Sequence, residues 1–212
     1  MATSRLAEAE AHLATADPVM AGLVARHGPC VLSRPSARRG SRAGATRFAA
    51  LVESVLYQQL AGSAAAAIHA RFVTALGGDV TPEAVLGAGE AVLRGAGLSG
   101  SKASTILGLS EAVVDGGLGL DRIGRRTDQE VVAELVRLRG IGPWTAQMFC
   151  IFTLGRLDVW PASDYGVRKG YAVAYGLGDL PAARWLEEAG GHFSPYRSVA
   201  AWYLWRAADA GV

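Results

Sequence analysis

Apolar residues recur along this chain at intervals of three and four, the spacing that places them on one face of an α-helix. The clearest such face begins at Arg47 and comprises Phe48, Leu51, Val52, Val55, Leu56 and Gln59. Similar patterns, several of them closed by glycines, predict helices over 5–13, 18–27, 63–76 and 101–114, a short helix opening at 81–83, and two more after Asp164 and Ser194. No stretch shows the alternation typical of a strand. We therefore predict an all-α globule of many short helices.

A tight glycine-containing hairpin joins two of the predicted helices between residues 138 and 146. The capping box 127–130 starts the first helix, and Gly140 ends it. Gly140 and Gly142 allow positive φ and close backbone approach, while Pro143 suits the first turn of the second helix. The partial positive charge of that helix N-terminus favours a phosphate, although an ordinary helix C-cap would give the same pattern. We assign phosphate binding to Gly140, Ile141, Gly142 and Thr145.

The hairpin sequence 138–146, with Asp164 twenty residues beyond Trp144, resembles the helix-hairpin-helix DNA glycosylase superfamily. Within it, the chain looks like the 3-methyladenine DNA glycosylase II branch, which removes alkylated purines. Three further segments carry the resemblance, namely 55–60, 97–103 and 195–205, so that it runs from about Phe48 to the C-terminus. It implies a two-lobed multi-helix fold without the N-terminal β domain of some relatives. The central lobe would span about 47–155, and the second lobe would combine about 1–46 with 156–212.

The resemblance also implies an activity. The chain would extrude an alkylated purine of the 3-methyladenine or 7-methylguanine type from double-stranded DNA and hydrolyse its N-glycosyl bond in base excision repair, leaving an abasic site. Relatives that also nick the strand form a Schiff base through a hairpin lysine, and Trp144 occupies that position here. We therefore expect a monofunctional hydrolase without lyase activity.

Asp164 is the candidate catalytic residue. It precedes a predicted helix and is well placed as an N-cap, which is its simplest structural role. A carboxylate at a helix N-terminus stays ionised, as a glycosidic cleavage with oxocarbenium-like character requires. The resemblance assigns the catalytic aspartate to this position. No strong general acid is needed, because an alkylated purine carries a positive charge and is already a good leaving group.

Aromatic residues are candidates for the pocket of the damaged base. Trp144 and Trp205 match aromatic pocket positions of the family, and Trp202 lies three residues before Trp205. Indoles attract a cationic base by about 1–2 kcal/mol when desolvated, although large aromatics also fill ordinary cores. Tyr57 could add aromatic surface. Met148 stands where the best-known bacterial relative has a tyrosine, so it would form a softer, less selective wall.

A wedge must hold the gap open once a base leaves the stack. Gln58, Gln59 and Leu60 end the predicted helix that begins at Arg47, at the place of the family's matching segment. We favour Gln59 as the wedge, because Leu60 also continues the apolar face and could belong to the core.

Composition limits the size of the core but does not identify the function. Half of the 212 residues are hydrophobic, enough for one substantial core or two lobes, and the formal net charge of +2 does not by itself identify a nucleic-acid binder. The stretch 34–47 is rich in small residues and either follows a phosphate backbone or is a solvated loop. Its arginines are Arg34, Arg38, Arg39, Arg42 and Arg47.

Cys30 and Cys150 are too few for a disulfide framework, a zinc site or a four-thiolate cluster, so we predict two reduced, structural thiols. No apolar run has the length of a membrane span, and the N-terminus has no signal-peptide core. We expect a cytoplasmic, nucleoid-associated monomer that binds DNA containing alkylated bases and has no membrane partner. No organic cofactor or side-chain metal site is expected, although a monovalent cation could bind the hairpin carbonyls.

Two other functions share these features. A noncatalytic helix-hairpin-helix DNA-binding module would need the hairpin but has no use for Asp164 and two tryptophans at family spacing. A glycosylase for mismatched, deaminated or oxidised bases is the second alternative. The missing hairpin lysine and cysteine cluster argue against its strand-nicking, cluster-bearing members only.

Overall fold

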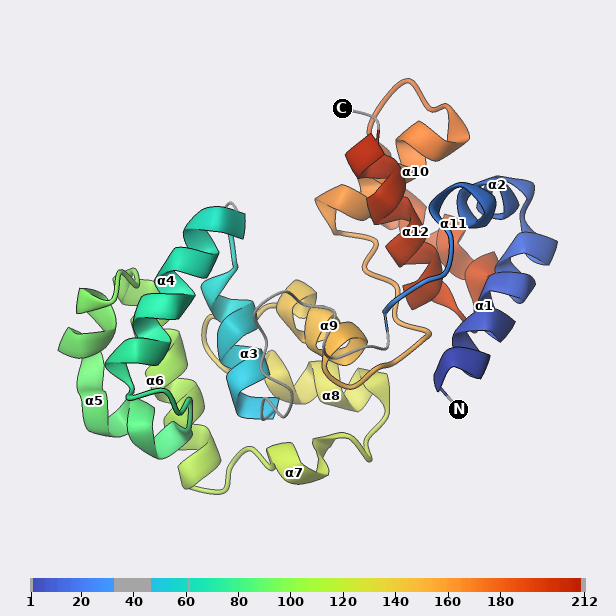
Figure 1. Cartoon of the computed structure of the whole chain (residues 1–212). Helices are drawn as coiled ribbons and strands as arrows, with labels where there is room; N and C mark the ends of the chain where they lie inside the picture. Colours follow the sequence, from blue (N-terminus) through green and yellow to red (C-terminus); the bar gives the residue numbers. More distant parts are fainter. Residues whose placement is uncertain (1, 33–46, 61, 211–212) are drawn as a thin grey trace. The chain divides into compact units, whose positions relative to one another are not determined.

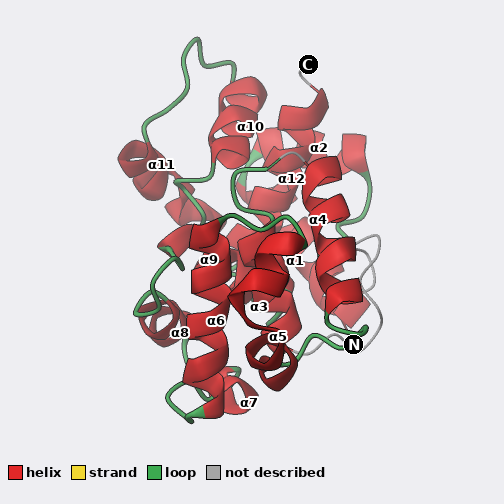
Figure 2. Cartoon of the chain, turned by 90° about the vertical axis from the view of Figure 1, so that its left-hand side faces the viewer, coloured by secondary structure: helices red, strands yellow, loops and turns green. Residues whose placement is uncertain are grey.

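The computed structural model describes residues 2–32, 47–60 and 62–210. All regular secondary structure in these ranges is helical, and Figures 1 and 2 show no strand there. The prediction of an all-α fold is confirmed. No helix in the described part of the chain is long and apolar enough to cross a bilayer.

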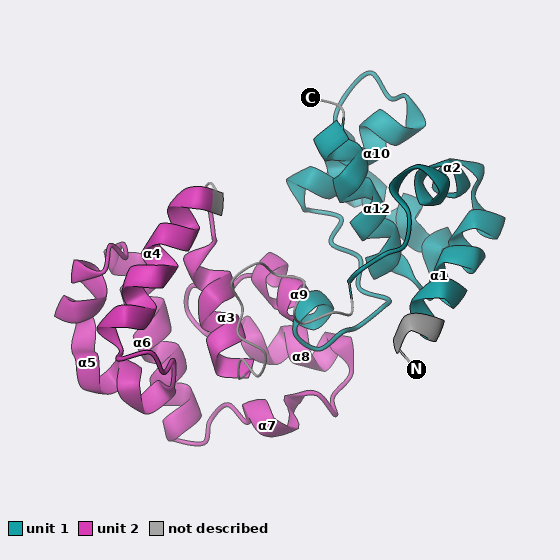
Figure 3. Cartoon of the chain, in the orientation of Figure 1, with its two compact units in different colours: residues 1–41, 150–212 teal, residues 42–149 magenta. Residues whose placement is uncertain are grey.

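The chain divides into two compact units (Figure 3). The first unit combines Met1–Ser41 with Cys150–Val212, and the second is Arg42–Phe149. The later junction lies inside a helix, a few residues before the expected position near 155.

The unit Arg42–Phe149 contains the apolar helical face that begins at Arg47 and the glycine hairpin 138–146. Its helices are α3 (Arg47–Leu56), α4 (Gly62–Ala75), α5 (Pro82–Gly95), α6 (Gly100–Val114), α7 (Leu120–Ile123), α8 (Asp128–Leu135) and the beginning of α9 (Pro143–Phe152). The predicted apolar face of α3 is buried, except that Gln59 lies beyond the helix end and is exposed. The predicted capping box at Thr127 and Glu130 starts α8. Helix α7 was not predicted, because four residues are too few to show a period.

The unit formed by the two chain ends contains α1 (Ala2–Ala16), α2 (Pro18–His27), α10 (Tyr165–Tyr175), α11 (Ala183–Ala189), the 3₁₀ turn η2 (Gly190–Phe193) and α12 (Arg197–Ala210). Helices α10 and α12 pack so closely that a Cβ at Gly170 would overlap the backbone of Leu204. This approach fixes the position of α10 on α12. The short α11 and η2 were not predicted from the sequence.

Asp17 connects three elements of this unit. Its Oδ1 accepts hydrogen bonds from Val19 N at 2.8 Å and Met20 N at 3.0 Å, and so caps α2. Its Oδ2 accepts from Tyr175 Oη at 2.7 Å and lies 3.0 Å from His192 Nε2. Burial opposes ionisation of this carboxyl, but the hydrogen bonds outweigh it and lower its pKa. Helices α2 and α10 and the η2 turn are thereby joined at one charged group.

Candidate active site

Asp164 lies at the N-terminus of α10, partly exposed, and is the N-cap that the sequence predicts. Its Oδ1 accepts a hydrogen bond from Val167 N at 2.8 Å and a second from the indole Nε1 of Trp205, also at 2.8 Å. One carboxylate oxygen therefore receives both a backbone donor of the helix end and a side-chain donor from α12. These contacts fix the orientation of the carboxylate.

Trp205 is seated by two residues that the sequence reasoning did not identify. Its ring stacks on Phe152 with centroids 5.6 Å apart and an angle of 24°. A Cβ at Gly166 would lie 2.8 Å from Trp205 Cδ1 and 3.1 Å from Asp164 Oδ1. Glycine is thus required for the indole to reach the carboxylate. A glycine two residues after an N-cap aspartate was a visible signal, whereas nothing in the sequence marks Phe152.

An ion pair holds the loop that leads to Asp164. Arg197 Nε donates to Asp158 Oδ1 at 2.8 Å and Arg197 Nη2 donates to Asp158 Oδ2 at 3.0 Å, a bidentate arrangement. Ser198 adds two links, because its backbone N donates to Leu157 O and its Oγ accepts from Val159 N, each at 2.9 Å. The loop is therefore tied to the first turn of α12, the same helix that supplies Trp205.

We expect Asp158→Asn to lower the free energy of unfolding by about 1–2 kcal/mol at neutral pH, since it weakens a partly buried charged hydrogen-bond set. Burial opposes ionisation of Asp158, but the hydrogen bonds from Arg197 and Ser194 prevail and lower its pKa. A lowered folded-state pKa gives stability above the unfolded value of about 3.9, which is lost as the pH falls through the folded value. Urea unfolding should therefore show the variant and wild type converging below about pH 4. A gap that persists unchanged at pH 3 would contradict this role.

The two glycines of the hairpin between α8 and α9 differ: Gly140 has the backbone conformation that the turn requires, and Gly142 lies exposed on the surface. Gly140 has a φ of +87°, and a Cβ there would overlap the side chain of Thr105. Gly142 has no positive φ and is exposed. A Cβ at this position would have no neighbouring atom within 4 Å. The expectation of positive φ is confirmed for Gly140 and wrong for Gly142. Ile141 is buried at 3% exposure, so its side chain anchors the hairpin.

Gln58 braces this hairpin. Its Nε2 donates to Gly140 O at 3.2 Å and to Thr145 Oγ1 at 2.9 Å. Thr145 is only 2% exposed as a whole residue, and its hydroxyl accepts from Gln58, so its contact with phosphate stays a prediction. The side chain of Gln58 is engaged within its own unit, which argues against it as the wedge. Gln59 is exposed with a φ of +54°, and Leu60 is 39% exposed, so the alternative of Leu60 as a core residue is wrong.

The other predicted pocket residues have different surroundings. Trp144 lies half-buried in the first turn of α9, and Met148, one turn later, is 5% exposed. Tyr57 makes an edge contact with His69, with centroids 6.5 Å apart. The Arg206 guanidinium lies 5.5 Å from the ring centroid of Trp202. The structure thus brings Trp205, and not Trp202, to Asp164.

The predicted phosphate-binding stretch 34–47 lies outside the described residues except for Arg47. Arg47 Nη1 donates to Leu120 O at 2.9 Å and to Asp121 O at 2.8 Å. Its guanidinium therefore links α7 to α3, a structural role that neither sequence alternative named; whether the stretch follows a DNA backbone stays a prediction.

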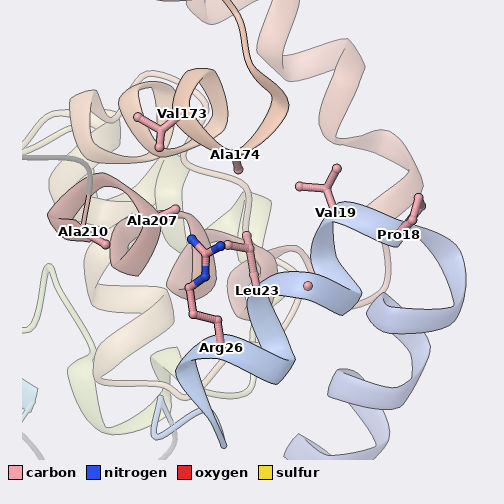
Figure 4. Close-up of a pocket in the computed structure, with 9 residues that line it drawn as sticks. Pro18, Val19, Leu23, Arg26, Val173, Ala174, Ala207 and Ala210 are labelled. Carbon is pink, nitrogen blue, oxygen red and sulfur yellow. The ribbon is translucent and has the colours of Figure 1, made fainter.

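Cys30 and Cys150 are free and buried, and burial raises the pKa of the Cys30 thiol to about 12. Among the described residues, no group of three His, Cys, Asp or Glu side chains could hold a metal ion. A pocket of about 330 Å³ lies between α2, α10 and α12, lined by Leu23, Arg26 and Val173 among others (Figure 4). Asp164 and Trp205 are not among its lining residues. The candidate active site is therefore separate from this pocket.

Comparison with known proteins adds an independent finding. The family described as "HhH-GPD superfamily base excision DNA repair protein" matches residues 52–192. A DNA-3-methyladenine glycosylase of Schizosaccharomyces pombe is 33% identical over 159 residues, covering 74% of this chain and 70% of that protein. A solved structure of the S. pombe 3-methyladenine DNA glycosylase in complex with abasic DNA matches with a TM-score of 0.82 and 31% identity, over 94% of this chain and 95% of that one. A DNA-3-methyladenine glycosidase of Bacillus halodurans matches with a TM-score of 0.73 and 32% identity, over 91% and 89%.

Proposed function

Because this chain belongs to the HhH-GPD superfamily of base excision DNA repair proteins, we propose that it is a DNA glycosylase that hydrolyses the N-glycosyl bond of alkylated purines in double-stranded DNA. The observation that carries this proposal is the geometry of Asp164. Its carboxylate stands at a helix N-terminus with one oxygen held by Val167 N and Trp205 Nε1. The names of the relatives support the alkylated purine as substrate.

The proposed chemistry uses the charge of this carboxylate. As the bond between C1′ and the purine nitrogen breaks, its electron pair leaves with the base and positive charge develops on the sugar. The oriented Asp164 carboxylate stabilises that charge, and it accepts a proton from the water whose oxygen bonds to C1′. An alkylated purine departs as a neutral base, so no protein acid is required. The products are a free base and an abasic site.

We further propose that the enzyme lacks lyase activity. Strand nicking needs an amine that attacks C1′, and Trp144 stands at the hairpin position where the resemblance places that lysine. The Nζ of Lys102 already donates to Leu56 O at 2.7 Å and Gln58 O at 2.8 Å. It is thus occupied within the fold. The resemblance also gives Trp144 the role of stacking on the base, and we retain that role as a proposal.

A base-release assay tests the proposed function. DNA treated with a methylating agent is incubated with the protein, and released 3-methyladenine, 7-methylguanine and hypoxanthine are separated by chromatography, the last from a deoxyinosine substrate. We expect the two alkylated purines to appear without strand breaks until alkali is added. A noncatalytic module would release no base. Release of hypoxanthine alone would favour the deaminated-base alternative.

The hairpin provides a separate prediction about DNA binding. Gly142→Val places a side chain in open space at the exposed tip, so the fold should be retained. If the backbone of this tip binds phosphate, the affinity of the variant protein for any duplex, damaged or not, should fall by about tenfold. Fluorescence anisotropy measures this loss. Gly87 is an exposed glycine of α5 with equally open surroundings. Gly87→Val is therefore the matched control and should bind DNA as wild type does. Unchanged affinity in a folded Gly142 variant would make the hairpin a structural turn only.

A further inference from the structure

Lys102 joins the end of one helix to the start of another. It lies near the N-terminus of α6, and its Nζ donates to Leu56 O at 2.7 Å and to Gln58 O at 2.8 Å. Leu56 is the last residue of α3, so the ammonium group meets the carbonyls at the negative end of that helix. The side chain is partly buried, and burial lowers the pKa of Lys102. A partly buried cation that donates to two carbonyls restricts the residues that carry them.

The same short segment is tied to the hairpin from its other side. Gln58 gives its backbone carbonyl to Lys102 and its side-chain amide to Gly140 O and Thr145 Oγ1. Thr105, one turn along α6 from Lys102, is the residue that a Cβ at Gly140 would overlap. Helix α6 therefore contacts both the end of α3 and the hairpin, and Gln58 bridges the two.

The residues just beyond this bridge are the exposed Gln59 and Leu60. Gln59 has a φ of +54°, a conformation that costs energy for a side chain with a Cβ and persists only where the neighbouring structure imposes it. The hydrogen bonds on both the backbone and the side chain of Gln58 supply that constraint. The exposed pair is therefore held at a fixed place relative to the hairpin within the same unit.

We propose that Lys102 is a positioning residue for base extrusion, which holds Gln59 and Leu60 in register with the phosphate-binding hairpin so that they enter the base stack where a nucleotide leaves it. The inference rests on the proposed function and adds a role that the resemblance does not assign. The contacts that a wedge makes in the base stack must offset the free energy of unstacking. A wedge that first had to become ordered would offset less of it.

The test compares lesions that do and do not require extrusion from a base pair. Lys102→Met keeps the unbranched shape and most of the length of the side chain but removes its charge and its donors. Single-turnover release of 7-methylguanine is measured from a fully paired duplex and from the same strand with the lesion in a one-nucleotide bulge. We expect the rate on the paired duplex to fall by about tenfold or more, as for the loss of charged hydrogen bonds, and the rate on the bulge to change by less than about threefold.

Arg71→Met is the matched control. Arg71 Nε donates to Ala96 O at 3.0 Å, just past the end of α5, so this variant also removes a cation from a helix end in the same unit. It should lower stability without changing the ratio of the two rates. Equal proportional losses on both substrates for Lys102→Met, or the same change of ratio for Arg71→Met, would overturn the proposal.

Two further measurements keep the outcome decisive. If Lys102→Met does not fold, Lys102→Gln, which retains amide donors without the charge, is tested by the same ratio and under the same criterion. 2-Aminopurine beside the paired lesion reports unstacking directly, and its fluorescence rise on binding should be smaller for the Lys102 variant than for wild type. If wild type releases 7-methylguanine from neither substrate, the proposed function fails for this lesion, and the fluorescence rise alone then decides the role of Lys102.

Discussion

Asp164→Asn should reduce single-turnover release of 3-methyladenine by about a hundred- to a thousandfold, the scale of losing one preorganised electrostatic contact to the transition state. The substitution removes the negative charge but leaves an oxygen that can still accept from Val167 N and from Trp205 Nε1. Asparagine is also as good an N-cap as aspartate. The melting temperature and the affinity for damaged DNA should therefore stay close to those of wild type.

Asp17→Asn is the matched control for this experiment. Asp17 is the N-cap of α2 in the same unit, and its side chain accepts from two backbone donors, where Asp164 accepts from one backbone donor and one indole. This variant should lose some stability, because Tyr175 and His192 also contact the carboxylate, yet its excision rate at 25 °C should match wild type. Near-normal excision by Asp164→Asn would remove the carboxylate from the mechanism and leave only its capping role.

Local signals in the sequence were sufficient to predict most of the helices and the position of Asp164. The capping box at Thr127, the N-cap at Asp164 and the turn at Gly140 depend on residues within four positions of one another. Such interactions follow from the covalent chain and its nearest donors, so they appear in the sequence itself. The all-α fold follows from the same spacing rules.

Interactions between distant segments could not be predicted in this way. Trp202 and Trp205 share one helix and one residue type, yet only Trp205 donates to Asp164, because Gly166 of another helix leaves space for its ring. Arg47 has the same charge as the other arginines of the stretch 34–47, but its hydrogen bonds go to α7, more than seventy residues away. Such partners depend on helix packing, which no local pattern records.

The contact between Trp205 and Asp164 leads to the second large effect, and it separates two roles of one side chain. Trp205→Phe keeps an aromatic ring that can stack on Phe152 but cannot donate to Asp164 Oδ1. If the indole N–H orients the carboxylate, single-turnover excision should fall by about ten- to a hundredfold, the value of a hydrogen bond to a charged group. Binding of abasic DNA, the product, should be nearly unchanged, which a general loss of structure would not allow.

The choice of lesion distinguishes orientation of the carboxylate from selection of a cationic base. Because Asp164 acts in the cleavage of every substrate, Trp205→Phe should slow the release of cationic 3-methyladenine and the release of neutral hypoxanthine in equal proportion, provided that hypoxanthine release is measurable. Trp205→Ala also removes the ring, so its additional loss should be greater for the cationic base, by about a further tenfold if a desolvated cation–π contact is lost. Trp202→Phe, on the same helix beside Arg206, is the control and should leave all rates within about twofold of wild type. Full activity in Trp205→Phe would show that the indole acts through its ring alone, since the hydrogen bond would then contribute nothing to the transition state.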